Sequence, residues 1–190
     1  SPELSKRLQK SGTGERCWNL AYMAQGAFFR PISSDDGQSG PRPHIGLIDE
    51  LHEHKTNTVV EMMRAGTKSR RQAMIFMITN AGHNRMGPCW SYHEYGARVA
   101  AGEVEDDAFF PFVCSLDEQD DPFADESCWP KANPSLQDAD LPGMKYIREQ
   151  VVEAKGMPSK EAIVRRLNFC QWTDAESPWI SGEVWRGAQR

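Results

Sequence analysis

The sequence predicts an α/β protein with a mostly parallel sheet flanked by helices, followed by a C-terminal helical segment. Two apolar runs, at residues 43–48 and 72–79, each have the length and bounds of a buried strand. An amphipathic stretch lies between them, and a strand, a helix and a second strand in this order form a βαβ unit with parallel strands. Two stretches near residues 142–155 and 159–169 carry apolar residues at helical spacing, which predicts the helical segment.

Turn and capping signals predict the remaining elements in order. A short helix begins at Ser1 to Glu3, and strand-like segments follow over residues 17–32. The central helix begins at Thr58, and a later one begins at Ser91, each at a Ser/Thr-x-x-Glu capping box. Residues 109–114 are apolar and predict a third strand, before a strongly acidic loop.

Composition excludes several classes of protein. The chain has 190 residues, enough for one domain with a core, and a net charge of -5. No apolar run approaches the roughly 20 residues of a membrane span, so we expect no contact with a membrane. Five scattered cysteines lack zinc-site spacing, which favours reduced thiols in a cytoplasm. The first residue is Ser1 and no signal-peptide pattern follows it, so we expect a piece of a longer protein.

The strongest chemical signal is an apolar run that ends in two acids, Asp49 and Glu50. In P-loop nucleotide hydrolases, the first carboxylate of such a pair helps to hold Mg²⁺, and the second orients or deprotonates the attacking water. The alternative is a strand that ends in a solvated acidic turn. Thr79 and Asn80 follow the second strand, where they are placed to contact a γ-phosphate or its water, or to form an ordinary turn.

Several motifs together resemble one family, the large terminase subunits of tailed bacteriophages. The resemblance covers nearly the whole chain, and the motifs follow one another in the order and at the spacing found in that family. It lies in residues 28–31, His44–His52, Arg70–Gln72, Ile78–Gly82, Trp129–Leu136, Leu167–Trp172 and the tryptophans Trp179 and Trp185.

The resemblance implies a P-loop ATPase fold of the ASCE type and a role for five residues. Asp49 corresponds to the Walker B aspartate, which holds Mg²⁺, and Glu50 corresponds to the catalytic carboxylate. Thr79 and Asn80 lie in the motif that couples hydrolysis to DNA movement and contacts the nucleotide. Arg30 is a candidate for the arginine finger that reaches a neighbouring subunit's nucleotide, the alternative being a structural salt bridge.

The resemblance also implies cofactors, partners and domains. The family hydrolyses ATP with Mg²⁺ to pump double-stranded viral DNA into a capsid, in the cytoplasm of a bacterial host. It acts as a homo-oligomeric ring with the small terminase subunit and the portal protein, and a nuclease domain cuts the DNA. Residues 1–170 correspond to the C-terminal part of the ATPase domain, and residues 171–190 to the linker toward the nuclease domain. Since the sequence lacks the Walker A motif, we expect this chain not to hydrolyse ATP alone.

Three other interpretations remain open. The run Asp49–His52 differs by one residue from the DEAH box of nucleic-acid helicases. Asp49, Glu50, His52 and His54 crowd together and offer ligands for a metallohydrolase, although they lack the HExxH spacing. The chain is also compatible with a truncated module that binds partners without catalysis.

Overall fold

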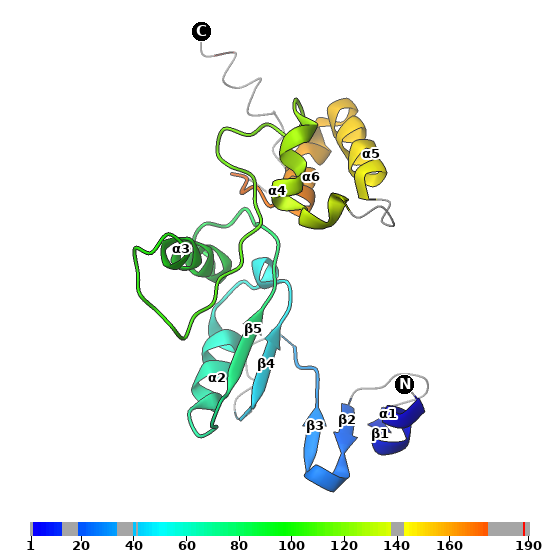
Figure 1. Cartoon of the computed structure of the whole chain (residues 1–190), viewed down its shortest axis with the longest axis vertical. Helices are drawn as coiled ribbons and strands as arrows, with labels where there is room; N and C mark the ends of the chain where they lie inside the picture. Colours follow the sequence, from blue (N-terminus) through cyan, green and yellow to red (C-terminus); the bar gives the residue numbers. More distant parts are fainter. Residues whose placement is uncertain are drawn as a thin grey trace.

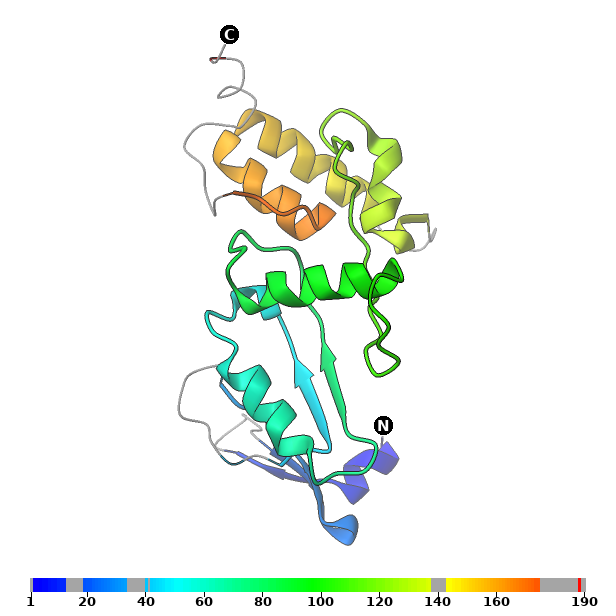
Figure 2. The same ribbon diagram turned by 90° about the vertical axis from the view of Figure 1, so that its left-hand side faces the viewer.

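The computed structural model describes residues 2–12, 19–33, 40, 42–137, 143–174 and 188. The elements form three groups along an elongated molecule (Figure 1). We call them the amino-terminal lobe (residues 2–33), the sheet lobe (residues 42–114) and the helical lobe (residues 115–169). The sheet lobe lies between the other two in both views (Figures 1 and 2).

The amino-terminal lobe is a small antiparallel sheet beside one short helix. Its elements are α1 (Pro2–Arg7), β1 (Gln9–Ser11), β2 (Asn19–Tyr22), the 3-10 helix η1 (Met23–Gln25) and β3 (Ala27–Phe29). The strand order is β1-β2-β3, and all pairs are antiparallel. The predicted helix and the strands within residues 17–32 are confirmed, but their closure into a separate antiparallel sheet was not predicted.

The sheet lobe contains the predicted βαβ unit. Its elements are β4 (Ile45–Ile48), the 3-10 helix η2 (Leu51–Glu53), α2 (Thr58–Thr67), β5 (Met74–Met77) and α3 (Pro88–Ala100). β4 and β5 pair in parallel, with Ile45 opposite Met74 and Ile48 opposite Met77. The parallel sheet of the predicted α/β fold is therefore confirmed. α3 begins three residues before the predicted Ser91, because Pro88 occupies its first turn.

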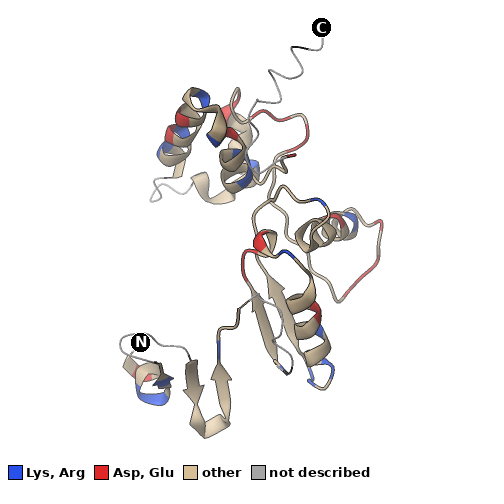
Figure 3. Ribbon diagram, turned by 180° about the vertical axis from the view of Figure 1, so that it is seen from behind, with Lys and Arg blue, Asp and Glu red and all other residues tan. Residues whose placement is uncertain are grey.

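In the part of the chain that the structure describes, α2 and α3 cover one face of β4 and β5. On the covered face, Ile48 is 4% exposed and belongs to a buried cluster with Leu51, Val60 and Cys89. The opposite face carries apolar side chains that are about half exposed: Ile45, Leu47, Met74 and Phe76. Figure 3 shows no charged residue on either strand, and shows acidic residues following β4.

The prediction of a third strand at residues 109–114 is wrong for the described chain. The sheet of β4 and β5 has two strands in the part that the structure describes, so this segment has no strand partner there. Its alternate residues pack on α3 instead, with the Phe109 ring 5.1 Å from that of Tyr95 and Pro111 beside Gly96. Phe110 and Phe112, which point away, are 89% and 79% exposed.

The helical lobe confirms the predicted C-terminal helices. Its elements are η3 (Glu126–Cys128), α4 (Trp129–Ala132), η4 (Pro134–Gln137), α5 (Gly143–Gly156), η5 (Pro158–Lys160) and α6 (Glu161–Phe169). Trp129 is 1% exposed and Phe169 0%, and their rings lie 5.8 Å apart in the core of this lobe. The indole N–H of Trp129 donates to the Pro122 carbonyl (2.8 Å), so the ring is buried with its polar atom satisfied.

Among the described residues, no helix has the length and apolar character needed to cross a membrane. The tryptophans Trp179 and Trp185, which carry part of the family resemblance, lie outside the described residues.

Candidate functional site

The candidate site lies at the carboxyl edge of β4 and β5, where two parallel strands end together. Asp49 and Glu50 follow β4 directly, and Ile78 to Asn80 follow β5. The two segments remain joined beyond the strands, because Ile78 N–H donates to the Ile48 carbonyl (3.0 Å) and Leu51 N–H donates to the Ile78 carbonyl (3.4 Å). This edge is where open α/β sheets bind ligands.

Asp49 offers a carboxylate to solvent at this edge. The residue is exposed, and its Oδ1 accepts the backbone N–H of Glu50 (2.9 Å). Carboxylate oxygens are the ligands that Mg²⁺ prefers, and Mg²⁺ bound through nucleotide phosphates needs only one or two of them. Asp49 therefore fits a Mg²⁺–nucleotide site. No group of three or more His, Cys, Asp or Glu side chains in the described chain could hold a metal, so the metallohydrolase interpretation gains no support there.

Glu50 has a left-handed backbone, with φ 50° and ψ 51°. This conformation costs a non-glycine residue about 1–2 kcal/mol, and it persists where surrounding contacts impose it. It turns the chain sharply from β4 into η2, which brings Glu50 and His52 to the same side. The Glu50 side chain is 54% exposed, and its Oε2 lies 3.1 Å from Nδ1 of His52.

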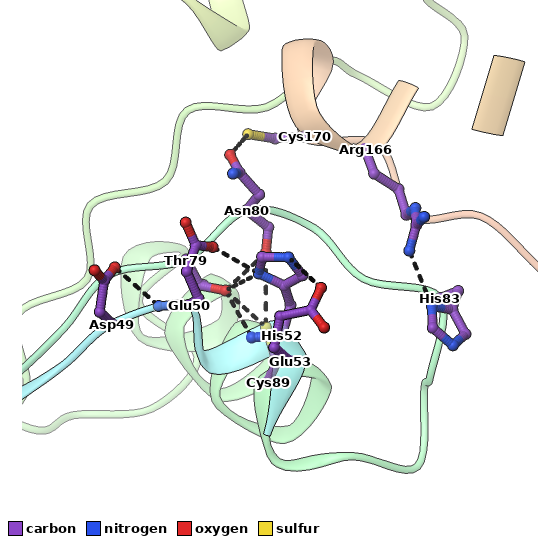
Figure 4. A network of polar contacts seen from close by, with 10 residues as sticks. All are labelled: Asp49, Glu50, His52, Glu53, Thr79, Asn80, His83, Cys89, Arg166 and Cys170. Carbon is purple, nitrogen blue, oxygen red and sulfur yellow. Dashed lines mark hydrogen bonds and ion pairs between the residues drawn. The ribbon is translucent and has the colours of Figure 1, made fainter. Parts of the chain in front are cut away.

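His52 connects the two strand ends (Figure 4). Its side chain is only 6% exposed. The backbone N–H of His52 donates to the Thr79 hydroxyl (2.9 Å), and ring Nδ1 lies 3.1 Å from the same oxygen. The other ring nitrogen, Nε2, lies 3.1 Å from Oε1 of Glu53. One imidazole thus joins two carboxylates of the β4 end to the hydroxyl of the β5 end.

Thr79 and Asn80 also contact two thiols, one from α3 and one from the end of α6. The Thr79 hydroxyl donates to the Asn80 carbonyl (2.9 Å) and lies 3.5 Å from Sγ of Cys89 in α3. The thiol of Cys170, which follows α6, donates to Oδ1 of Asn80 (3.8 Å). Burial raises the pKa of both thiols, so they stay protonated as hydrogen-bond donors at neutral pH.

The segment after Asn80 is the contact between the site and the helical lobe. Nδ1 of His83 lies 3.0 Å from Nη1 of Arg166, a residue of α6 that is 7% exposed. A Cβ at Gly82 would lie 3.2 Å from the Trp172 ring and 3.5 Å from Cβ of His52. The Trp172 ring in turn lies 4.7 Å from the Trp90 ring, edge to face. Movement of the helical lobe would therefore act directly on this segment.

Two family models match this chain. The family model of the terminase large subunit ATPase domain matches residues 20–98, and that of the terminase large subunit endonuclease domain matches residues 103–189. Together they cover most of the chain. The chain belongs to the terminase large subunit family. Because both matched families are terminase domains, the resemblance to large terminase subunits is confirmed, and a helicase is not favoured.

Two relatives extend the similarity. Protein YmfN of Escherichia coli strain K12 is 29% identical over 154 residues, which are 79% of this chain and 32% of YmfN. The crystal structure of the HK97 bacteriophage large terminase has a TM-score of 0.72 at 19% identity, over 98% of this chain and 37% of that one. This likeness shows the terminase fold. The chain spans about a third of the length of these relatives.

The structure does not bring Arg30 to the candidate site of the same chain. Arg30 is exposed and follows β3 directly. In Figures 1 and 2, β3 lies on the side of the amino ends of β4 and β5, whereas Asp49 and Glu50 follow the carboxyl end of β4. Arg30 therefore lies away from Asp49 and Glu50 of its own chain in this arrangement, and a role as an arginine finger would require a neighbouring subunit.

Several residues of the candidate site are not indicated by the sequence patterns. Those patterns present His52 as a candidate metal ligand and as part of a DEAH-like run, although its place two residues after Glu50 could have indicated a contact with that carboxylate. The sequence does not place Cys89, Cys170 and Arg166 at the site, because they reach it from α3, from the end of α6 and from α6 itself, far along the chain.

Proposed function

We propose that this chain provides the carboxylates for ATP hydrolysis in a motor that moves double-stranded viral DNA into a capsid. These carboxylates lie at the carboxyl edge of β4 and β5. The observation that supports this most is the pair Asp49 and Glu50 at the end of β4, joined through His52 to Thr79 at the end of β5. A motor that couples hydrolysis to movement needs such a link between its carboxylates and a segment that contacts another lobe.

Each predicted residue has a role in this proposal. Asp49 holds Mg²⁺, which offsets charge on the phosphates of ATP. Glu50 orients the attacking water or accepts its proton. Thr79 and Asn80 contact the γ-phosphate or that water, and they transmit the state of the nucleotide. Arg30 acts as an arginine finger on a neighbouring subunit's nucleotide, where its fixed charge stabilises the transferring phosphoryl group.

The motor works with partners that this proposal takes from the family. It assembles as a homo-oligomeric ring with the small terminase subunit, the portal protein and double-stranded DNA, in the cytoplasm of the bacterial host. A nuclease domain cuts the DNA. We also propose that residues 1–170 belong to the ATPase domain and residues 171–190 to a linker, although the two family matches meet between residues 98 and 103.

Glu50→Gln tests the proposal in a terminase large subunit that contains this chain together with a phosphate-binding loop. Because a positioned general base contributes about 10²- to 10⁴-fold to a reaction rate, we expect kcat for ATP to fall by about that factor. Affinity for ATP changes little, since the amide keeps the size of the side chain. Glu149→Gln, a change in an exposed carboxylate of α5 in the helical lobe, is the control and leaves kcat unchanged. Persistent turnover by Glu50→Gln would refute the assignment of Glu50.

The chain by itself is expected not to hydrolyse ATP, because its sequence contains no GxxxxGK[ST] loop to hold the phosphates. Phosphate release by the purified 190-residue chain is compared with that of its Glu50→Ala variant. Equal, background rates are the expected result. A higher rate for the unaltered chain would mean that it has its own phosphate cradle.

A further inference from the structure

His52 is placed to control the direction of the Glu50 carboxylate. The Glu50 side chain is 54% exposed, and a half-exposed glutamate normally samples several rotamers. His52 is 6% exposed, so packing fixes its ring. A carboxylate that accepts a hydrogen bond from a fixed ring loses much of its rotational freedom. The Glu50–His52 contact of 3.1 Å therefore orients a group that solvent would otherwise leave mobile.

The chemistry of its partner makes ring Nδ1 of His52 a donor toward Glu50. Carboxylate oxygens only accept hydrogen bonds, and Glu50 Oε2 lies 3.1 Å from Nδ1. The Thr79 hydroxyl lies 3.1 Å from the same nitrogen, and a hydroxyl oxygen can accept as well as donate, so it is compatible with an Nδ1–H.

We propose that His52 is a positioning residue that fixes the Glu50 carboxylate beside Thr79 through its Nδ1–H. This inference rests on the proposed function, since the direction of Glu50 matters to the rate only if Glu50 acts on water. The other ring nitrogen, Nε2, contacts Glu53, whose side chain is 74% exposed, and the proposal assigns the orientation of Glu50 to Nδ1 alone. Because His52 contacts both Thr79 and Glu50, a shift of the Thr79–Asn80 segment would change the direction of the Glu50 carboxylate.

A matched pair of substitutions separates the two ring nitrogens. The amide of His52→Asn replaces Nδ1, and the amide of His52→Gln extends toward the place of Nε2. In the large subunit used for Glu50→Gln, we expect His52→Gln to lower kcat for ATP by about 10- to 100-fold, since small misplacement of a reacting group can cost about 100-fold. We expect His52→Asn to lose less than about threefold and so to rescue the rate. The KM for ATP stays within about threefold in both.

Three results would overturn the proposal, and each is distinct. Equally lowered kcat values for His52→Asn and His52→Gln would mean that Nδ1 has no special role. A loss of kcat that merely follows the melting temperature of each variant would mean that His52 only stabilises the fold. Unchanged kcat in both variants, with turnover abolished by Glu50→Gln, would refute the role of His52 while leaving the proposed function intact. Turnover by Glu50→Gln would instead refute the proposed function itself.

A double-mutant cycle with Glu50 gives a second test. If His52 acts on the rate only through the Glu50 carboxylate, the double variant His52→Gln/Glu50→Gln has nearly the kcat of Glu50→Gln alone. Losses that multiply would show independent action and would overturn the proposal.

Discussion

Phe169→Ala is expected to lower the free energy of unfolding of this chain by about 3–5 kcal/mol. Phe169 is the last residue of α6 and is 0% exposed. Its ring packs beside Trp129 in a cluster that also contains Ile147, Val151 and Val164. Removal of the ring leaves a cavity that two helices cannot fill without repacking. The loss is a large part of the 5–15 kcal/mol that holds a typical domain together.

The expected loss is measured by urea denaturation followed by circular dichroism. Leu167→Ala is the control in the same helix, because Leu167 is 46% exposed and its truncation leaves no closed cavity. We expect this control to change the free energy of unfolding by less than about 1 kcal/mol. Equal losses for the two variants would mean that the helical lobe does not pack around Phe169 in solution.

Gly82→Val is expected to separate the helical lobe from the site. Gly82 is buried, and even a Cβ there would lie 3.2 Å from Trp172 and 3.5 Å from His52. The branched side chain of valine extends into both neighbours, one a rigid indole and the other a buried imidazole. Such overpacking costs about 1–3 kcal/mol. Because Thr173 N–H also donates to the Gly82 carbonyl (3.4 Å), the displacement of Trp172 would disrupt the backbone contact as well.

Gly156→Val is the matched control for Gly82→Val, because it adds the same side chain at a site with open space. Gly156 ends α5, and a Cβ there meets no atom within 4 Å. We expect the control to leave the melting temperature nearly unchanged, whereas Gly82→Val lowers it by several degrees. In the complete large subunit, Gly82→Val also lowers ATP turnover, since it displaces the ring that orients Glu50. A Gly82→Val variant as stable as the control would show that Trp172 does not pack on this segment in solution.

The sequence predicted the parts of the site that depend on local pattern. Asp49 and Glu50 could be placed because they end an apolar strand, and parallel strands bring their carboxyl ends to one edge. Thr79 followed from the same argument applied to the next strand. Contacts from the helical lobe could not be predicted in this way. Arg166 and His83 are 83 residues apart, and Cys170 and Asn80 are 90 apart, so no periodicity connects them.

The third predicted strand failed for a related reason. Residues 109–114 are apolar, as a buried strand would be. A strand also needs a neighbouring strand with free backbone N–H and C=O groups, and composition does not show whether such a neighbour exists. In this chain, Phe109 and Pro111 pack on α3 while Phe110 remains exposed. The boundaries of α3 were misplaced because the capping box at Ser91 competes with Pro88, which lies one turn earlier. Such choices between adjacent helix starts depend on tertiary packing.

The edge-to-face pair of Trp90 and Trp172 gives the protein an optical signal of its own. Trp90 belongs to α3 and Trp172 to the segment that leaves the helical lobe, and their ring centroids are 4.7 Å apart at 86°. Two indoles this close couple their electronic transitions, so they produce an exciton doublet in circular dichroism that vanishes when the rings part. The intensity of this doublet therefore measures the contact between the sheet lobe and the segment that leaves the helical lobe, without a fluorescent label.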